Sequence, residues 1–225
     1  MTRIIQKSDG KGSLKDIQVL INKNQDFLNK LIKSKLNDLK NADIIWTSPI
    51  ENDDFAEYRD NDFLIKVGLD PLAIQLDKFW PARGPQWDAL AKTNSGQVIL
   101  VEAKANIPEI VSQKTSAKNK SKCLIDYSLN ETKHFLNINN DTNWSGKFYQ
   151  YTNRLAHLYF LREKCNKSAF LINIYFIGDK TVSGPKTEQE WKGALKVLNT
   201  YFGISRHKLK KYMLDLFIDI KDLEY

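Results

Sequence analysis

The chain has 225 residues, a hydrophobic content of 42% and a net charge of +7 at pH 7. These values allow a single domain with a real core, so we expect residues 1–225 to fold together. The charge favours a polyanionic partner, although such a charge is also common in proteins that bind no polyanion. Two cysteines exclude a disulfide framework. A secretory leader and a membrane-spanning apolar run are both missing from the sequence, so we expect a reduced, cytoplasmic protein without a membrane partner.

The first strong pattern is an amphipathic helix over residues 13–36, with Ser13 at its N-cap and Asp16 in its first turn. We assign residues 1–45 to an N-terminal helical extension. The polar face of this helix is rich in lysine, which can be solvated or can contact nucleic acid, and the spacing does not decide between these possibilities. The lysines are Lys23, Lys30, Lys33 and Lys35.

Residues 44–83 are less regular. We expect a short apolar segment at 44–46, a helix over 53–64 that carries Glu57, and a strand at 72–76, where apolar residues alternate with others. A buried corner follows, with Arg83 just after it. Arg83 can make a bidentate contact with phosphate, or can be an ordinary surface arginine.

The next segment predicts a β-hairpin. The turn formers in residues 92–96 separate an acid, Asp88, from an apolar strand that begins at residue 98 and continues to Glu102 and Lys104. Strand side chains alternate between faces, so Glu102 and Lys104 point the same way. The hairpin would bring Asp88 beside Glu102.

This convergence of two carboxylates and a lysine has a chemical use. Carboxylates with open coordination positions suit Mg²⁺, with Mn²⁺ as an alternative, and such an ion polarises a phosphoryl group and acidifies a bound water. The lysine can orient or deprotonate that water, or stabilise the charge that develops. The alternative is an ordinary hairpin with a surface ion pair.

Residues 112–122 form the most polar stretch of the chain, and we expect a flexible basic loop there. Because the loop directly follows the hairpin strand, it could hold phosphate groups; alternatively its charges are simply solvated. Its lysines are Lys114, Lys118, Lys120 and Lys122.

The second half of the chain alternates helices and strands. We expect a short helix or an extended piece at 123–129, a second helix at 131–138, and a long amphipathic core helix at 148–163. In the long helix Gln150 and Arg154 lie one turn apart on one face. The same helix contains His157, which has no companions at metal-ligand spacing and is expected to be a satisfied helix histidine.

The last elements have clear boundaries. Residues 169–178 are almost continuously apolar, as in a strand buried on both faces, and the intervening helix predicts a parallel or mixed pairing. A capping box at Thr187 and Glu190 begins a helix that ends at Gly203. Alternating residues at 214–220 predict a final strand.

Asp88, followed by Glu102-Ala103-Lys104 at the end of an apolar strand, resembles the PD-(D/E)xK nuclease superfamily. Thirteen residues separate Asp88 from Glu102, as in that family's hairpin, although Trp87 stands where the family usually has proline. The resemblance covers residues 45–180. It implies an α/β fold with a central mixed β-sheet flanked by helices, a restriction-endonuclease-like core, with residues 181–225 adding a helix and a strand.

The resemblance also implies an activity, the Mg²⁺-dependent hydrolysis of phosphodiester bonds in nucleic acid, with DNA as the expected substrate of this endonuclease-like hydrolase. Nucleic-acid contacts would come from Arg83, Arg154 and the loop lysines. The implied catalytic roles are metal binding by Asp88, Glu102 and the Ala103 carbonyl, water positioning or activation by Lys104, a further acid at Glu57, and support from Gln150. Glu57 can equally be a surface glutamate of its helix.

Two other functions stay open at this point. The same fold can serve as a non-catalytic nucleic-acid-binding or protein-interaction module, because function is a property of the site and not of the fold. A phosphate-bond enzyme with another substrate is also compatible with the motif. Cutting both strands of a duplex would favour two copies of the site, so a homodimer is possible.

Overall fold

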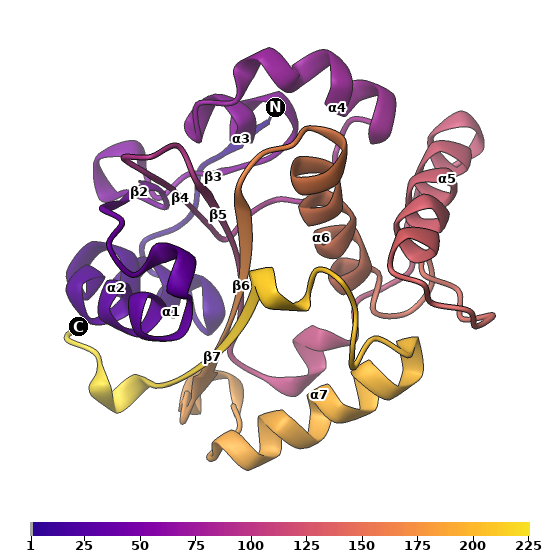
Figure 1. Cartoon of the computed structure of the whole chain (residues 1–225). Coiled ribbons are helices and arrows are strands. Elements are labelled where there is room, and N and C mark those ends of the chain that lie inside the picture. The colour runs from indigo at the N-terminus through magenta and orange to yellow at the C-terminus, as the bar shows by residue number, and fades with distance from the viewer. Residues whose placement is uncertain (1) are drawn as a thin grey trace.

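The computed structural model describes residues 2–225, which form an α/β fold around a five-stranded mixed sheet of order β2-β4-β5-β6-β7 (Figure 1). Strands β2, β4 and β5 are antiparallel, whereas β5, β6 and β7 are parallel. The expected class, a central mixed sheet flanked by helices, is therefore confirmed. The strands are β2 (Ile44–Ser48), β4 (Ala89–Thr93), β5 (Val98–Lys104), β6 (Ala169–Ile177) and β7 (Met213–Asp219).

Helices cover both faces of the sheet. Helices α1 and α2 pack on one face, and α5, α6 and α7 contribute to the core on the other, with α6 directly against β6 (Figure 1). Among the described residues, no helix is both long enough and apolar enough to cross a bilayer. The helices are α1 (Ser13–Lys23), α2 (Gln25–Lys35), α3 (Asp60–Lys66), α4 (Ala73–Phe79), α5 (Asn119–Phe135), α6 (Tyr149–Tyr159) and α7 (Glu188–Phe202).

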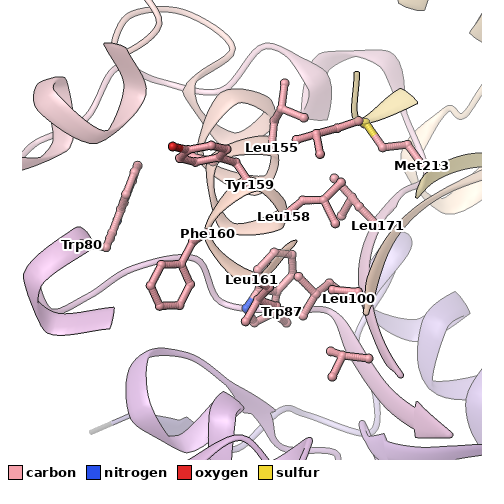
Figure 2. Close-up of a cluster of buried hydrophobic side chains, with 14 of the residues drawn as sticks. Trp80, Trp87, Leu100, Leu155, Leu158, Tyr159, Phe160, Leu161, Leu171 and Met213 are labelled. Carbon is pink, nitrogen blue, oxygen red and sulfur yellow. The ribbon is translucent and has the colours of Figure 1, made fainter. Parts of the chain in front are cut away.

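Helix α6 is the main covering element on the face that carries the hairpin motif. Its residues Leu155 and Leu158 are fully buried and belong to one cluster with Leu100 of β5 and Leu171 of β6 (Figure 2). Trp87, directly before the motif acid, is buried in the same cluster. The packing of α6 therefore fixes the position of polar side chains on its first turns relative to the sheet.

Several sequence-based boundaries are confirmed. The β4–β5 hairpin turns at residues 94–97, and all nine residues of β6 are buried, as expected for a parallel strand covered on both faces. Helix α7 begins with Thr187, whose side chain accepts a hydrogen bond from the Glu190 amide, and is followed by Gly203 at a φ of 68°.

The prediction of a strand at 72–76 is wrong. The segment forms a 3-10 turn at Asp70–Leu72, followed directly by α4. Leu72, Leu76 and Phe79 are buried, while Ile74 is 69% exposed. The apolar residues therefore follow the helical period, and the apparent alternation over five residues was too short to separate the two patterns.

The helix predicted at 53–64 is also placed wrongly. Glu57–Tyr58 forms a two-residue strand, β3, which pairs with β1 (Arg3–Ile4) in a separate two-stranded sheet. Asp54 has a φ of 53°, which no helix interior accommodates. Helix α3 begins only at Asp60, so Glu57 reaches its position from a strand.

Two helix boundaries differ from expectation as well. The helix predicted at 13–36 is interrupted at Asn24, whose amide side chain donates to the Val19 and Glu224 carbonyls. The two pieces expected in 123–138 form one helix, α5, which starts earlier at Asn119. Lys120 and Lys122 consequently lie in the first turn of α5 and not in a loop.

Candidate functional site

The hairpin brings the three motif residues together at one end of the sheet. Ala89 lies opposite Val101 in the β4–β5 ladder, so one further step of the register places Asp88 opposite Glu102. The Asp88 Oδ2 atom accepts a 2.7 Å hydrogen bond from the Ala103 amide. Lys104 Nζ donates to Glu102 Oε1. These contacts link all three residues through β5.

Glu102 is held by two cations. Its Oε1 atom pairs with Lys104, and its Oε2 atom accepts a 2.6 Å hydrogen bond from Arg154 Nε on α6. Burial alone would raise the pKa of Glu102, but Arg154 and Lys104 outweigh burial and lower it. Glu102 is therefore the ionised carboxylate of the site.

Arg154 is the principal organiser on the helix side. It is only 4% exposed, and its guanidinium donates to Asn153 Oδ1 at 2.8 Å and to the Gln86 carbonyl at 2.6 Å. The guanidinium carbon also lies 5.0 Å from the ring centre of Trp87. All three nitrogens thus have protein partners, and the expected contact between Arg154 and a phosphate stays a prediction.

Glu57 lies close enough to the motif to interact with it electrostatically. Gln6 Nε2 donates to Glu57 Oε2 at 3.0 Å, and Gln86 donates to the same oxygen. Burial, together with the Glu102 charge, raises the pKa of Glu57 to about 7, against the lowering effect of the Gln86 and Gln6 hydrogen bonds. The structure therefore brings the expected third acid into the motif's surroundings, although from β3.

The pKa values of Asp88 and Lys104 are also shifted by burial and by the neighbouring charges. Burial raises the pKa of Asp88 well above its usual value, and the neighbouring Glu102 raises it further. Burial alone would lower the pKa of Lys104, but Glu102 and Asp88 outweigh burial and raise it. The lysine is therefore protonated, and burial favours the neutral form of Asp88.

A small pocket beside the motif opens between α6 and strands β5 and β6. Gln150 lies in its wall, and its own backbone amide is fixed by a 2.8 Å hydrogen bond to Ser112 Oγ. The expected support residue is thus close to Lys104. The polar and aromatic side chains of the pocket are Glu102, Lys104, Gln150, Tyr151, Arg154, Asn173 and Tyr175.

The basic residues separate into two groups. Arg83, Lys114 and Lys118 line one groove. Lys122 instead pairs with Asp126 and donates to Ser145 Oγ at 3.1 Å, and Lys120 is an exposed residue of α5. The 112–118 segment is coil that is hydrogen-bonded to the start of α6, because the Phe148 amide binds the Ser112 carbonyl.

Sequence reasoning missed a polar row that continues the site across the sheet. Asn173 of β6 lies opposite Glu102, and Asp215 of β7 lies opposite Asn173. Asn173 Nδ2 donates to Asp215 Oδ1 at 2.8 Å, and Lys210 pairs with Asp215 at 3.2 Å. The available signal was Asn173 itself, the one polar side chain inside an otherwise apolar and aromatic strand.

The oxygen donors present fit a hard divalent cation in part. Asp88 and Glu102 supply two adjacent carboxylates, and the Ala103 carbonyl shares the side of β5 on which its amide binds Asp88. Each carboxylate keeps lone pairs beyond those used in the hydrogen bonds above. Within residues 2–225, no group of three or more His, Cys, Asp or Glu side chains is arranged to hold a metal ion.

Comparisons of this chain with protein-family models, with curated proteins and with solved structures find no match. A buried carboxylate, a half-buried carboxylate, a protonated lysine and a buried arginine converge at one sheet end. Such an arrangement can hold a cation and an anionic group side by side.

Proposed function

We propose that the chain is a metal-dependent nuclease with a restriction-endonuclease-like core, which hydrolyses phosphodiester bonds of nucleic acid, with DNA as the first substrate to test. The observation that carries the proposal is the meeting of Asp88, Glu102 and Lys104 at one end of the β4–β5 hairpin. The net charge of +7 and the groove lined by Arg83, Lys114 and Lys118 also favour a polyanionic substrate.

Each side chain has a role that follows from its surroundings. Asp88, Glu102 and the Ala103 carbonyl would hold Mg²⁺ or Mn²⁺, which supplies charge stabilisation and an acidified water. Lys104 carries a raised pKa, so it acts as a hydrogen-bond donor that positions the water or stabilises the developing negative charge. Arg154 holds the Glu102 carboxylate in place, and Gln150 borders the same pocket.

The test is cleavage by the Lys104→Ala variant. We expect wild-type protein with Mg²⁺ or Mn²⁺ to nick closed circular DNA, and the variant to lose at least ~100-fold in rate, the usual contribution of such a group. Lys196→Ala, at an exposed position of α7, is the matched control. Full cleavage by Lys104→Ala, with a metal-dependent wild type, would remove the lysine from the mechanism.

A non-catalytic binding or interaction module is the second candidate. It is favoured by the pairing of both Glu102 oxygens with cations, because Lys104 and Arg154 then compensate the Glu102 charge without a metal. Calorimetric titration of Mn²⁺ separates the two candidates, first without and then with added DNA duplex. Saturable binding that Asp88→Ala removes supports the nuclease, whereas the absence of binding under both conditions supports the module.

A further inference from the structure

The groove that contains Arg83, Lys114 and Lys118 lies at the start of α6, the helix that also carries Arg154 of the candidate site. One wall is the segment Pro81–Ala82–Arg83, and the other is the coil around Lys114 and Lys118. Tyr149, the first residue of α6, also lines the groove. The lining therefore combines positive charge from both segments with an aromatic ring.

A chain of polar contacts connects this groove to the motif. Burial raises the pKa of Tyr149, and hydrogen bonds with the side chains of Thr115 and Asn153 partly oppose the rise. Asn153 in turn accepts from Arg154, which binds Glu102. A ligand in the groove would thus lie within a few side chains of the reacting centre.

A second pocket is lined by residues of α4 and α5 and of the segment 160–165. Its lining includes Phe79 and Phe160, whose rings stack at 5.1 Å between centres. Tyr127 of α5 borders this pocket and is 67% exposed. Because the Tyr127 ring is largely exposed, burial in the core does not account for it. The ring and the apolar floor beside it form a surface on which a flat ligand can stack.

Both pockets border α5. Ser121 and Ile125 line the first, and Tyr127 and Ser128 line the second. The end of α4 is joined to α5 by a hydrogen bond from the buried Ser128 Oγ to the Phe79 carbonyl. From Asn119 to Glu131, helix α5 rises roughly 18 Å. We use the name α4–α5 groove for these two pockets taken together.

Charge along the α4–α5 groove is mainly positive. Arg83, Lys114 and Lys118 lie at the end near the site, and Lys78 and Lys164 at the far end. Lys164 is paired with the acid of the far pocket, Glu131, at 2.7 Å, so the net positive charge there is that of Lys78. A ligand with repeated negative charges would therefore meet net positive charge at both ends of the groove.

We propose that the α4–α5 groove binds single-stranded nucleic acid and guides it to the candidate active site. This inference rests on the proposed function and specifies its substrate class. A duplex hides the faces of its bases, so it could use the lysines but neither Tyr127 nor the apolar floor. An unpaired strand can place phosphates on the cations and stack a base on an aromatic ring.

The test is binding of labelled oligonucleotides of about 12 nucleotides without divalent metal, followed by fluorescence anisotropy. Single-stranded DNA and RNA are compared with a DNA duplex. We expect Tyr127→Ala to weaken single-strand binding at least about fivefold and to leave duplex binding unchanged. Tyr201→Ala, at a half-exposed position of α7, is the matched control and should bind like the wild type.

A second variant addresses the cations. Lys78→Ala with Lys164→Ala should reduce the salt dependence of single-strand binding, whereas Lys192→Ala with Lys196→Ala on α7 should not. Equal affinities of Tyr127→Ala and Tyr201→Ala for the single strand, or a wild-type protein that prefers the duplex, would overturn the inference. The binding test and the cleavage test are independent. If wild-type protein cleaves no nucleic acid but Tyr127→Ala still weakens single-strand binding, the proposed hydrolysis is wrong and the binding inference holds.

Discussion

Glu102 is bound by cations from two different elements, Lys104 on its own strand and Arg154 on helix α6. Both partners are well buried, so neither contact resembles a surface ion pair of small value. Loss of one partner from a buried ion pair leaves an uncompensated charge, which is much more costly than the loss of an exposed pair. At the scale of single residues, Arg154 thus both stabilises the fold and holds Glu102, a residue of the candidate site, in place.

We therefore expect Arg154→Met to lower the free energy of unfolding by about 3 kcal/mol. Adding Glu102→Gln should recover part of this loss, because the buried charge is then removed together with its partner. Urea unfolding of the two single variants and the double variant measures the coupling. Arg83→Met, which changes an exposed guanidinium, is the control and should have little effect. Strictly additive losses would show that Arg154 and Glu102 do not act as a pair.

At the scale of elements, helix α4 shows how a short apolar pattern can mislead. Residues 72–76 have apolar side chains at every second position, and a strand would place all of them on one face. In the helix these side chains lie on different faces: Leu76 is only 3% exposed, whereas Ile74 faces solvent. This difference gives a direct test with two similar substitutions.

Leu76→Ala should lower the free energy of unfolding by about 2–4 kcal/mol, through lost burial and the cavity that remains. Ile74→Ala should change it by about 0.5 kcal/mol or less, since the side chain is already largely solvated. Thermal or urea unfolding of both variants provides the measurement. Comparable losses for both would be the result expected of a strand and would contradict α4.

How much the sequence could predict depended on the length of each pattern. Strand β6 and helix α7 were readable because one is apolar throughout and the other has residues with clear capping chemistry at both ends. The break at Asn24 was hidden, since α1 and α2 continue one helical pattern, and the reason for the break is a contact with Glu224 at the other end of the chain.

In the candidate site, too, local contacts could be predicted from the sequence and long-range contacts could not. Asp88, Glu102 and Lys104 were predictable because strand alternation and a short turn place them together locally. The pairing of Glu102 with Arg154 spans 52 positions, and the opposition of Glu102 and Asn173 depends on the parallel register of β5 and β6. Such contacts are set by tertiary packing, which one sequence does not specify position by position.

At the scale of the whole molecule, a buried acid connects both ends of the chain. Asp16 of α1 is 3% exposed and accepts a 2.8 Å hydrogen bond from the hydroxyl of Tyr225, the last residue. Burial, together with the nearby charges of Asp179 and Glu109, raises the pKa of Asp16 to about 7, against the lowering effect of the Tyr225 hydrogen bond. The folded protein consequently holds a proton there that the unfolded chain releases near pH 4.

This difference fixes the sign of a pH effect. Between about pH 4 and pH 7 the folded state binds more protons at Asp16 than the unfolded state does, so this group's contribution to stability falls as the pH rises. Asp16→Asn cannot ionise, and its amide can still accept from Tyr225. We expect this variant to match the wild type near pH 5 and to exceed it near pH 8, by on the order of 1 kcal/mol. Urea midpoints at the two pH values provide the measurement, with the exposed Asp26→Asn as control. A gain that is equal at both pH values would show that Asp16 does not titrate in this range, and that the connection between the chain ends is insensitive to pH.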